Sequence, residues 1–300
     1  MSETTPTLRG VDQVVTAHRQ REGAGFIVRR PVPTAGRNQV DPFLLLDEFG
    51  PIDYAPGEAV GAPDHPHRGF ETVSYILEGE FEHEDSAGHR GILHAGDVQW
   101  MTAAGGIVHS EMPSRRIQQE GGRVHGFQIW LNLPARLKMS RPRYQEIPSS
   151  QIPRAQSPDG KARVNVVAGE VLGVKAVIQT HTPIVFQDWT LEEGAEVTFA
   201  LPADHQSVVY VFQGSVQVGV EATQVKEGQM AILGAGDTVL LKGPQQGSPA
   251  RLLVLAGVPI NEPVARYGPF VMNTEREIHQ AIRDYQEGRF AQITRTATTT

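Results

Sequence analysis

Cysteine is absent from the 300-residue chain, which excludes disulfide bonds, thiolate ligands and cysteine nucleophiles. Long apolar runs are also missing, since none reaches the roughly 18 to 20 residues that a membrane-spanning helix needs. The first ten residues are polar and lack the basic end, apolar centre and small-residue cleavage site of a secretory signal. We therefore expect a cytoplasmic protein, in which histidine nitrogen and carboxylate oxygen hold any bound metal.

Basic residues are outnumbered by acidic ones. The chain has 27 lysine and arginine residues against 34 aspartate and glutamate residues, a formal net charge of -7. This balance argues against a broad phosphate-binding surface, so we expect no direct binding to nucleic acid. The sequence also lacks a Gly-X-Ser-X-Gly nucleophile elbow, a phosphate-binding loop and a dinucleotide-binding fingerprint.

Short runs rich in β-branched and aromatic residues fill residues 40–135. Three of them are ETVSYILEGEFEHED, RGILHAGDVQWMTAAGG and VHGFQIWLNLP, each punctuated by glycine, proline or aspartate. Turn residues every ten or so positions indicate an antiparallel β sandwich or barrel. We predict an all-β fold.

A weaker version of the same pattern follows the polar, proline-containing segment at residues 148–164. SYILEGEFEHE aligns with VYVFQGSVQVG, and LHAGDVQWMTAAGG aligns with VKEGQMAILGAGD. The order of strand, turn glycine and strand indicates an internal duplication of a jelly-roll domain. We place an N-terminal domain at residues 1–145 and a C-terminal domain, with a final helix, at residues 146–300.

That final helix is predicted from residues 274–288. Thr274 is a helix-capping residue type, acidic residues follow it, and Ile278, Ile282 and Tyr285 recur at helical spacing before Gly288.

Two pairs of candidate metal ligands repeat one spacing. His65 and His67 are one residue apart, as are His109 and Glu111. Residues i and i+2 of a strand face the same side, so each pair aims two donor groups at one place. Imidazole and carboxylate donors suit Fe, Ni, Cu, Mn, Co or Zn, and four protein ligands would leave coordination positions open. The second repeat has neither motif. Three other histidines lie in or beside a hairpin and are expected to face solvent: His83, His89 and His94.

The segments HPHRGFETVSYILEGEFEHEDSAGHRG, GDVQWMTAAGGIVHSEMP, FQIWLNLP and RYGPFVMNTEREIHQAI resemble the signature segments of the pirin family in the cupin superfamily. The resemblance implies a bicupin with one metal ion, most suitably Fe(II), in the N-terminal domain only. The family's ligands fall on the four residues that the spacing selects. Glu71 lies where many other cupins supply a carboxylate, and its role stays open between a ligand and a buried neighbour of the site.

Three further residues are candidates for a substrate pocket, with plain core packing as the alternative. They are Phe70, Trp100 and Gln128. The aromatic residues would supply walls, and Gln128 lies on a strand that we expect to cross the cavity.

Two functions from different classes agree with these features. Pirin-like proteins are similar to quercetin 2,3-dioxygenases, in which the metal binds the 3-hydroxyl oxygen of a flavonol and dioxygen attacks the ring. Glu111 would then accept the substrate proton. The alternative is a non-enzymatic, iron-dependent redox sensor that binds a transcription factor or metabolic enzyme. An enzyme predicts a deep pocket at the metal, whereas a sensor predicts a shallow site under an extended docking face. A purely structural ion is a third reading, which an open site disfavours.

Overall fold

The computed structural model describes residues 6–293 and divides into two compact units. The site-bearing unit comprises Arg19–Arg30, Phe43–Ser149 and the chain from Ile260 onward. The second unit comprises the chain up to His18, Pro31–Pro42 and Ser150–Pro259. Within the described residues, no helix is long and apolar enough to cross a membrane.

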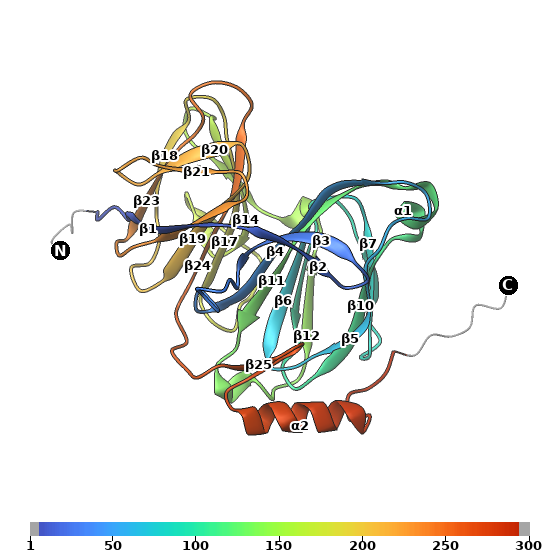
Figure 1. Ribbon diagram of the computed structural model, residues 1–300. Coiled ribbons are helices and arrows are strands. Elements are labelled where there is room, and N and C mark those ends of the chain that lie inside the picture. The colour runs from blue at the N-terminus through green and yellow to red at the C-terminus, as the bar shows by residue number, and fades with distance from the viewer. Residues whose placement is uncertain (1–5, 294–300) are drawn as a thin grey trace. The chain divides into compact units, whose positions relative to one another are not determined.

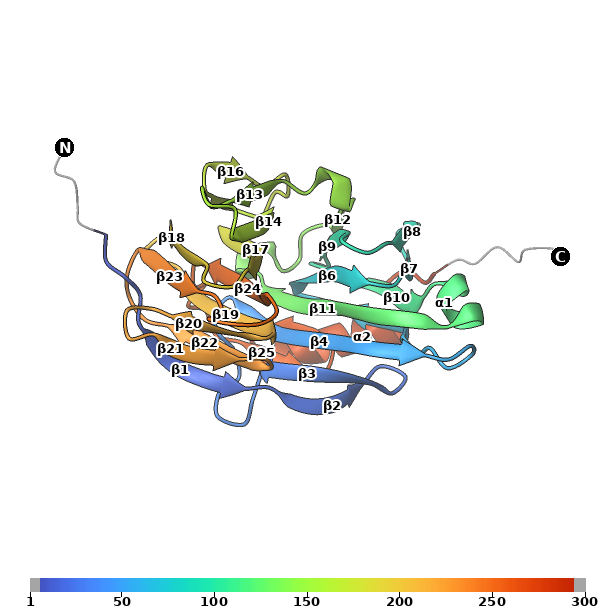
Figure 2. The ribbon, with the colours of Figure 1, turned by 90° about the horizontal axis from the view of Figure 1, so that it is seen from above.

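The larger sheet of the site-bearing unit is antiparallel, and Figure 2 shows its central strands side by side. Its strands, in spatial order, are β12 (Arg143–Ile147), β9 (Val98–Thr102), β6 (Phe70–Glu78), β11 (Gly122–Asn132), β4 (Phe43–Tyr54), β3 (Phe26–Val32) and β2 (His18–Glu22). The central strands β6 and β11 consist mostly of buried apolar and aromatic residues. Such residues favour the pleated, packed environment of a sheet.

A smaller sheet of the same unit carries the two candidate ligand pairs. Its order is β5 (Ala62–His67), β10 (Ile107–Pro113), β7 (Phe81–Asp85) and β8 (Arg90–Leu93). The remaining elements of this unit are α1 (Arg115–Glu120), the 3-10 turn Ala135–Leu137, the hairpin β25 (Ala265–Tyr267) and β26 (Phe270–Met272), and α2 (Glu275–Gln286). The 3-10 turn Ser149–Gln151 follows at the boundary with the second unit.

The second unit also has two main sheets. The larger contains β1 (Val11–Thr16), β22 (Gln229–Leu233), β19 (Gln206–Gln213), β24 (Ala250–Gly257), β17 (Ile184–Leu191), β14 (Ala162–Ala168) and β13 (Arg154–Gln156). The smaller contains β18 (Glu196–Ala200), β23 (Thr238–Lys242), β20 (Ser215–Val218) and β21 (Thr223–Lys226), with a separate hairpin of β15 (Glu170–Val171) and β16 (Val174–Lys175).

The two units repeat one strand order, which confirms the internal duplication. The series β9-β6-β11-β4 of one large sheet corresponds to β22-β19-β24-β17 of the other, and β5-β10-β7-β8 corresponds to β18-β23-β20-β21. In each unit the chain passes from the large sheet to the small sheet after the corresponding strand, from β4 to β5 in one unit and from β17 to β18 in the other. The all-β prediction with two jelly-roll domains is confirmed.

The C-terminal helix forms where the sequence predicts it, but belongs to the other unit. Thr274 caps α2, and Glu277 completes a capping box with it. Figure 1 shows α2, in red, running beneath β25. Ile278 and Ala281 pack with Val108 of β10 in one apolar cluster. The expected boundaries of 1–145 and 146–300 therefore differ from the contacts, because the chain after Ile260 buries its apolar face on the site-bearing unit.

A buried lysine fastens this returning segment. The Nζ atom of Lys138 donates hydrogen bonds to the carbonyl oxygens of Gly69 at 2.7 Å and Val271 at 3.0 Å, and to Oδ1 of Asn132 at 2.7 Å. Burial lowers the pKa of Lys138 to about 8. Gly69 has a φ of +92°, and a Cβ there would lie 1.9 Å from the carbonyl oxygen of Val271. Only glycine fits this approach, which lies two residues after His67.

Candidate metal centre

Antiparallel pairing of β5 and β10 brings three histidines together. His109 lies directly opposite His65, and Ile107 lies opposite His67. Donor atoms of the three imidazoles lie within 4.8 Å of one another. His67 and His109 are buried, whereas His65 is partly exposed. The i, i+2 spacing and the strand register therefore place three imidazole groups at one point.

The hydrogen bonds of these histidines leave lone pairs for a cation. Nδ1 of His65 donates to the carbonyl oxygen of Pro63 at 2.7 Å, so its Nε2 carries a lone pair. That Nε2 lies 3.0 Å from Nε2 of His67. Both ring nitrogens of His109 are buried without a hydrogen-bond partner among the described residues. Buried polar atoms of this kind are costly unless paired, so the three residues fit a divalent metal ion.

Burial keeps the inner two histidines neutral. Desolvation lowers the pKa of His67 and of His109 well below the ordinary 6.5, and the neighbouring His65 lowers both further. The positive charge of Arg266 also disfavours protonation of His67. Neutral imidazole is the form that binds metal, so both ligands are ready for binding at neutral pH.

Glu111 lies at the edge of the cluster. Its Oε2 is 3.9 Å from Nε2 of His109, but it is not part of the compact three-histidine group. The register of β10 against β5 shifts between His109 and Glu111, an irregularity that redirects side chains at the edges of sites. Glu111 as a fourth ligand stays a prediction.

A serine on the neighbouring sheet holds the Glu111 carboxylate. Oγ of Ser74 donates to Oε1 of Glu111 at 2.6 Å, and it lies 2.8 Å from the side-chain amide of Gln128. Ser74 is the donor in both contacts, so the single hydrogen of its hydroxyl group is shared between Oε1 of Glu111 and Oε1 of Gln128. Ser74 and Gln128 are paired residues of β6 and β11.

The cluster opens on a cavity of about 660 Å³. His65, His67 and Glu111 line it together with Gln128 and Trp130. His109 is not among the lining residues and is only 1% exposed. The volume lies in the range of small-molecule sites, so the metal position is reachable by an organic ligand.

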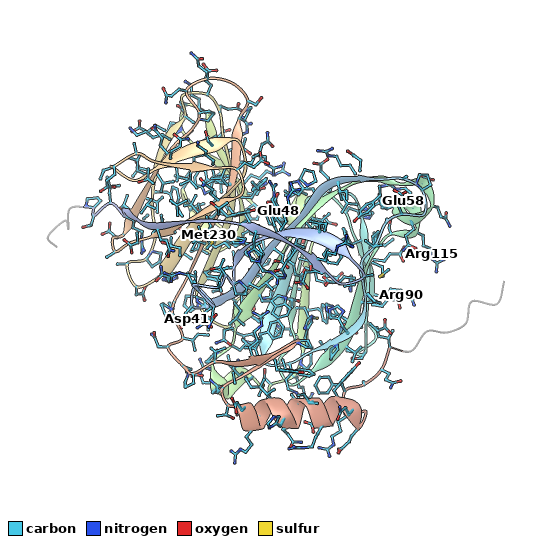
Figure 3. The ribbon with its side chains drawn as sticks, viewed as in Figure 1. Asp41, Glu48, Glu58, Arg90, Arg115 and Met230 are labelled. Carbon is cyan, nitrogen blue, oxygen red and sulfur yellow. The ribbon has the colours of Figure 1, made fainter. Side chains whose placement is uncertain are left out.

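Charged residues line the side of the cavity formed by β2, β3 and β4. Arg30 donates two hydrogen bonds to the carboxylate of Asp47, and Glu22 lies 2.7 Å from the same guanidinium group. Burial raises the pKa of Asp47 to about 6, although Arg30 opposes the shift. Next to Asp47 on β4, Glu48 (labelled in Figure 3) accepts a hydrogen bond from Nε2 of His125 at 2.9 Å. Asp47 and Glu22 are therefore engaged by Arg30, and Glu48 by His125.

Two of the three expected pocket residues do not line the cavity. Trp100 pairs with Val73 of β6, so it faces the side of the sheet away from Ser74 and is 1% exposed. Phe70 is fully buried, and its ring packs edge-on against the ring of His67 with 5.1 Å between the centroids. The pocket assignments of Phe70 and Trp100 are corrected on these grounds, whereas Gln128 does line the cavity.

Glu71 is buried beside the strand rather than among the ligands. Glu71 follows Phe70 on β6 and lies opposite Thr102 of β9. Oγ1 of Thr102 donates a hydrogen bond to Oε1 of Glu71 at 2.6 Å. Burial raises the pKa of this carboxyl group. Glu71 is not one of the residues grouped around the candidate metal position. It is fully buried between neighbouring strands of the large sheet.

The expectation that His83 faces solvent is wrong. His83 is 1% exposed, lines the cavity and lies 2.6 Å from Oε1 of Glu146. Strand β7 pairs with β10 so that His83 lies opposite Glu111, and alternation along β7 turns it inward. His89 and His94 have exposed side chains, as expected.

Comparison with known proteins settles the family. The family model described as Pirin matches residues 25–131, and the model described as Pirin C-terminal cupin domain matches residues 186–291. The chain belongs to the pirin family. A pirin-like protein of Solanum lycopersicum is 44% identical over 94% of this chain and 92% of its own length. The duplicated β units are accordingly the two cupin domains of a bicupin.

Solved structures agree with this assignment. A crystal structure of quercetin 2,3-dioxygenase from Acinetobacter baumannii matches 96% of this chain and 100% of its own, with a TM-score of 0.89 and 36% identity. A bacterial pirin from Escherichia coli, solved in complex with nickel(II), matches 82% of this chain and 99% of its own, with a TM-score of 0.61 and 20% identity. The second likeness concerns the fold alone.

Proposed function

We propose that this pirin is a metal-dependent dioxygenase that cleaves flavonol-like compounds such as quercetin. The observation that carries the proposal is the three-histidine cluster at the wall of a 660 Å³ cavity. A sensor would need only a shallow metal site beneath a docking face, whereas a cavity of this size accommodates a substrate. The likeness to the A. baumannii quercetin 2,3-dioxygenase structure supports the same reaction class.

His65, His67 and His109 would hold the ion, with Glu111 as the fourth ligand. A bound ferrous ion would supply Lewis acidity toward a substrate oxygen and electrons for dioxygen chemistry. Nitrogen and oxygen donors also accept nickel, copper, manganese, cobalt and zinc, and the nickel(II) complex of the E. coli pirin is an example of one such ion in a relative.

Glu111 is proposed as the base that accepts the proton of the flavonol 3-hydroxyl group. Its Oε2 is free of the hydrogen bond from Ser74 that Oε1 accepts, so Oε2 is the atom that would receive the proton. Ser74 donates a hydrogen bond to this carboxylate and is itself in contact with Gln128. Trp130 provides an apolar surface for the flavonol rings, since it lines the cavity beside His67 at 5.2 Å between ring centroids.

The test is turnover by protein reconstituted anaerobically with iron. Quercetin loss and carbon monoxide release are measured in air for the wild type and for the His65→Ala/His109→Ala double variant. A second double variant, His18→Ala/His279→Ala, removes two exposed histidines outside the cavity and serves as the matched control. We expect turnover in the wild type and the control, and none in the ligand variant.

A flavone identical to quercetin except for the missing 3-hydroxyl group completes the design. It should not be cleaved, because it lacks the 3-hydroxyl group whose proton Glu111 would accept and whose oxygen would bind the metal. Absence of quercetin turnover in protein that holds one iron per chain would overturn the proposed activity and favour the redox sensor.

A further inference from the structure

Arg266 is a cation of the cavity that the proposed reaction does not use. It lies on β25 and lines the cavity, where its guanidinium carbon is 4.7 Å from the ring centroid of Trp130. One nitrogen donates to the carbonyl oxygen of Leu44 at 3.3 Å. Arg266 is therefore held over an aromatic wall by a cation–π contact and one hydrogen bond.

No carboxylate of residues 6–293 forms an ion pair with this guanidinium group, although the charges of Asp47 and Glu22 act on it from farther away. The ion pairs of that part of the chain do not include Arg266, whereas Arg30 has both Asp47 and Glu22 within 2.7 Å. Burial and the charge of Arg30 lower the pKa of Arg266, whereas the charges of Asp47 and Glu22 raise it. An anion bound in the cavity would add the direct partner that Arg266 lacks, because a partly desolvated charge is stabilised by a hydrogen-bonded counter-charge.

The distances around Trp130 give an upper limit to the length that such a ligand must span between Arg266 and the histidines. Trp130 lies 5.2 Å from the ring of His67 and 4.7 Å from the guanidinium carbon of Arg266. The distance from the guanidinium carbon of Arg266 to the centroid of the His67 ring is therefore at most the sum of these two distances. One aromatic ring with a hydroxyl group at one end and a carboxylate at the other can span this length.

We propose that Arg266 forms a subsite for a carboxylate carried by the aromatic substrate, so that the natural substrates are hydroxylated aromatic acids or flavonol-like compounds with an acidic group. The planar guanidinium matches a carboxylate through two parallel hydrogen bonds. Glu22 and Asp47 on the same cavity wall disfavour a polyanion such as a phosphate ester. The inference rests on the proposed function only for the position of the hydroxyl group at the histidines.

The experiment measures binding without turnover. Protein loaded with Zn²⁺, which is redox-inert, is titrated by calorimetry with 3,4-dihydroxybenzoate and with 3,4-dihydroxybenzamide, which differ in the charged group alone. We expect the benzoate to bind roughly tenfold more tightly, the effect of one charged hydrogen-bonded contact. In Arg266→Gln the ratio of the two dissociation constants should fall to near one, with binding of the benzamide unchanged.

Arg276→Gln is the matched control, since it removes one exposed arginine of α2 outside the cavity and should keep the wild-type ratio. A charge preference that survives Arg266→Gln would overturn the subsite, as would equal binding of both probes to the wild type. Because no turnover is needed, failure of quercetin cleavage leaves this result interpretable, and cleavage without a charge preference would remove the subsite alone.

Discussion

The two cupin units share a strand order but fill their interiors differently. In the site-bearing unit, β5 and β10 present His65, His67 and His109 to a cavity wall. The strands in the same places of the second unit, β18 and β23, contribute buried apolar residues to a continuous core: Val197, Phe199, Val239 and Leu241. Phe199 also stacks on Trp189, with 4.8 Å between ring centroids.

The contrast separates what the fold needs from what the site needs. The second unit shows that this jelly roll closes around a mainly apolar core, with no histidine cluster among the residues described there. A cavity in the other unit forgoes the dispersion contacts and apolar burial that a filled core provides. The jelly-roll fold therefore does not require the histidines, since the second unit forms it with apolar residues on the corresponding strands.

The largest expected effect is loss of the metal in His109→Ala. Removal of one of three clustered imidazoles should reduce the metal content from about one ion per chain to near zero, while circular dichroism stays that of a folded β protein. Metal analysis of purified protein checks the result. His205→Ala, in the second unit, is the control and should keep its metal. An unchanged metal content in His109→Ala would contradict the site.

A core substitution tests the other side of the comparison. Phe199→Ala should lower the free energy of unfolding by about 3 to 5 kcal/mol, because it leaves a cavity in a packed interior. Trp130→Ala should cost less stability, since Trp130 lines an existing cavity, but it should weaken ligand binding. Urea denaturation of both variants measures the difference. Equal stability losses would show that the cavity wall is as tightly packed as the second core.

The smallest effect is a pH dependence confined to the metal-free protein. The pKa values of His67 and His109 are lowered in the folded state, so the unfolded chain binds more protons as the pH falls below about 6.5. Stability should be fully present above that pH and decline as the pH falls toward the folded-state values. Thermal unfolding at a series of pH values measures this decline. In His67→Leu/His109→Leu the slope should flatten, and an unaltered slope would assign it to other groups.

Local patterns were sufficient for the parts of the molecule that depend on near neighbours. The capping box of α2 follows from Thr274 and Glu277, three residues apart. The i, i+2 spacing of His65 and His67 follows from strand geometry. The duplication could be read from turn glycines because each hairpin is a local unit.

Long-range register decided what sequence reasoning missed. Trp100 faces away from the cavity because it lies opposite Val73 of β6, whereas Ser74 lies opposite the residue before Trp100. No local signal in the sequence predicts this register. His83 belongs to an alternation with Phe81 and Asp85 along β7, which indicates an inward face once β7 is read as a strand. Arg266 reaches the cavity only because the last part of the chain returns to the first barrel.

That return has a consequence for the order of events during synthesis. The backbone of Arg68, next to His67, is hydrogen-bonded to Pro269 and Val271. Its guanidinium pairs with Asp284, which lies 216 residues later in the chain. A nascent chain emerging from the ribosome can form β5 to β11 long before these contacts exist. The loop that follows the His-X-His pair is thus secured only when translation is nearly complete, and the first cupin unit is finished by the last part of the chain.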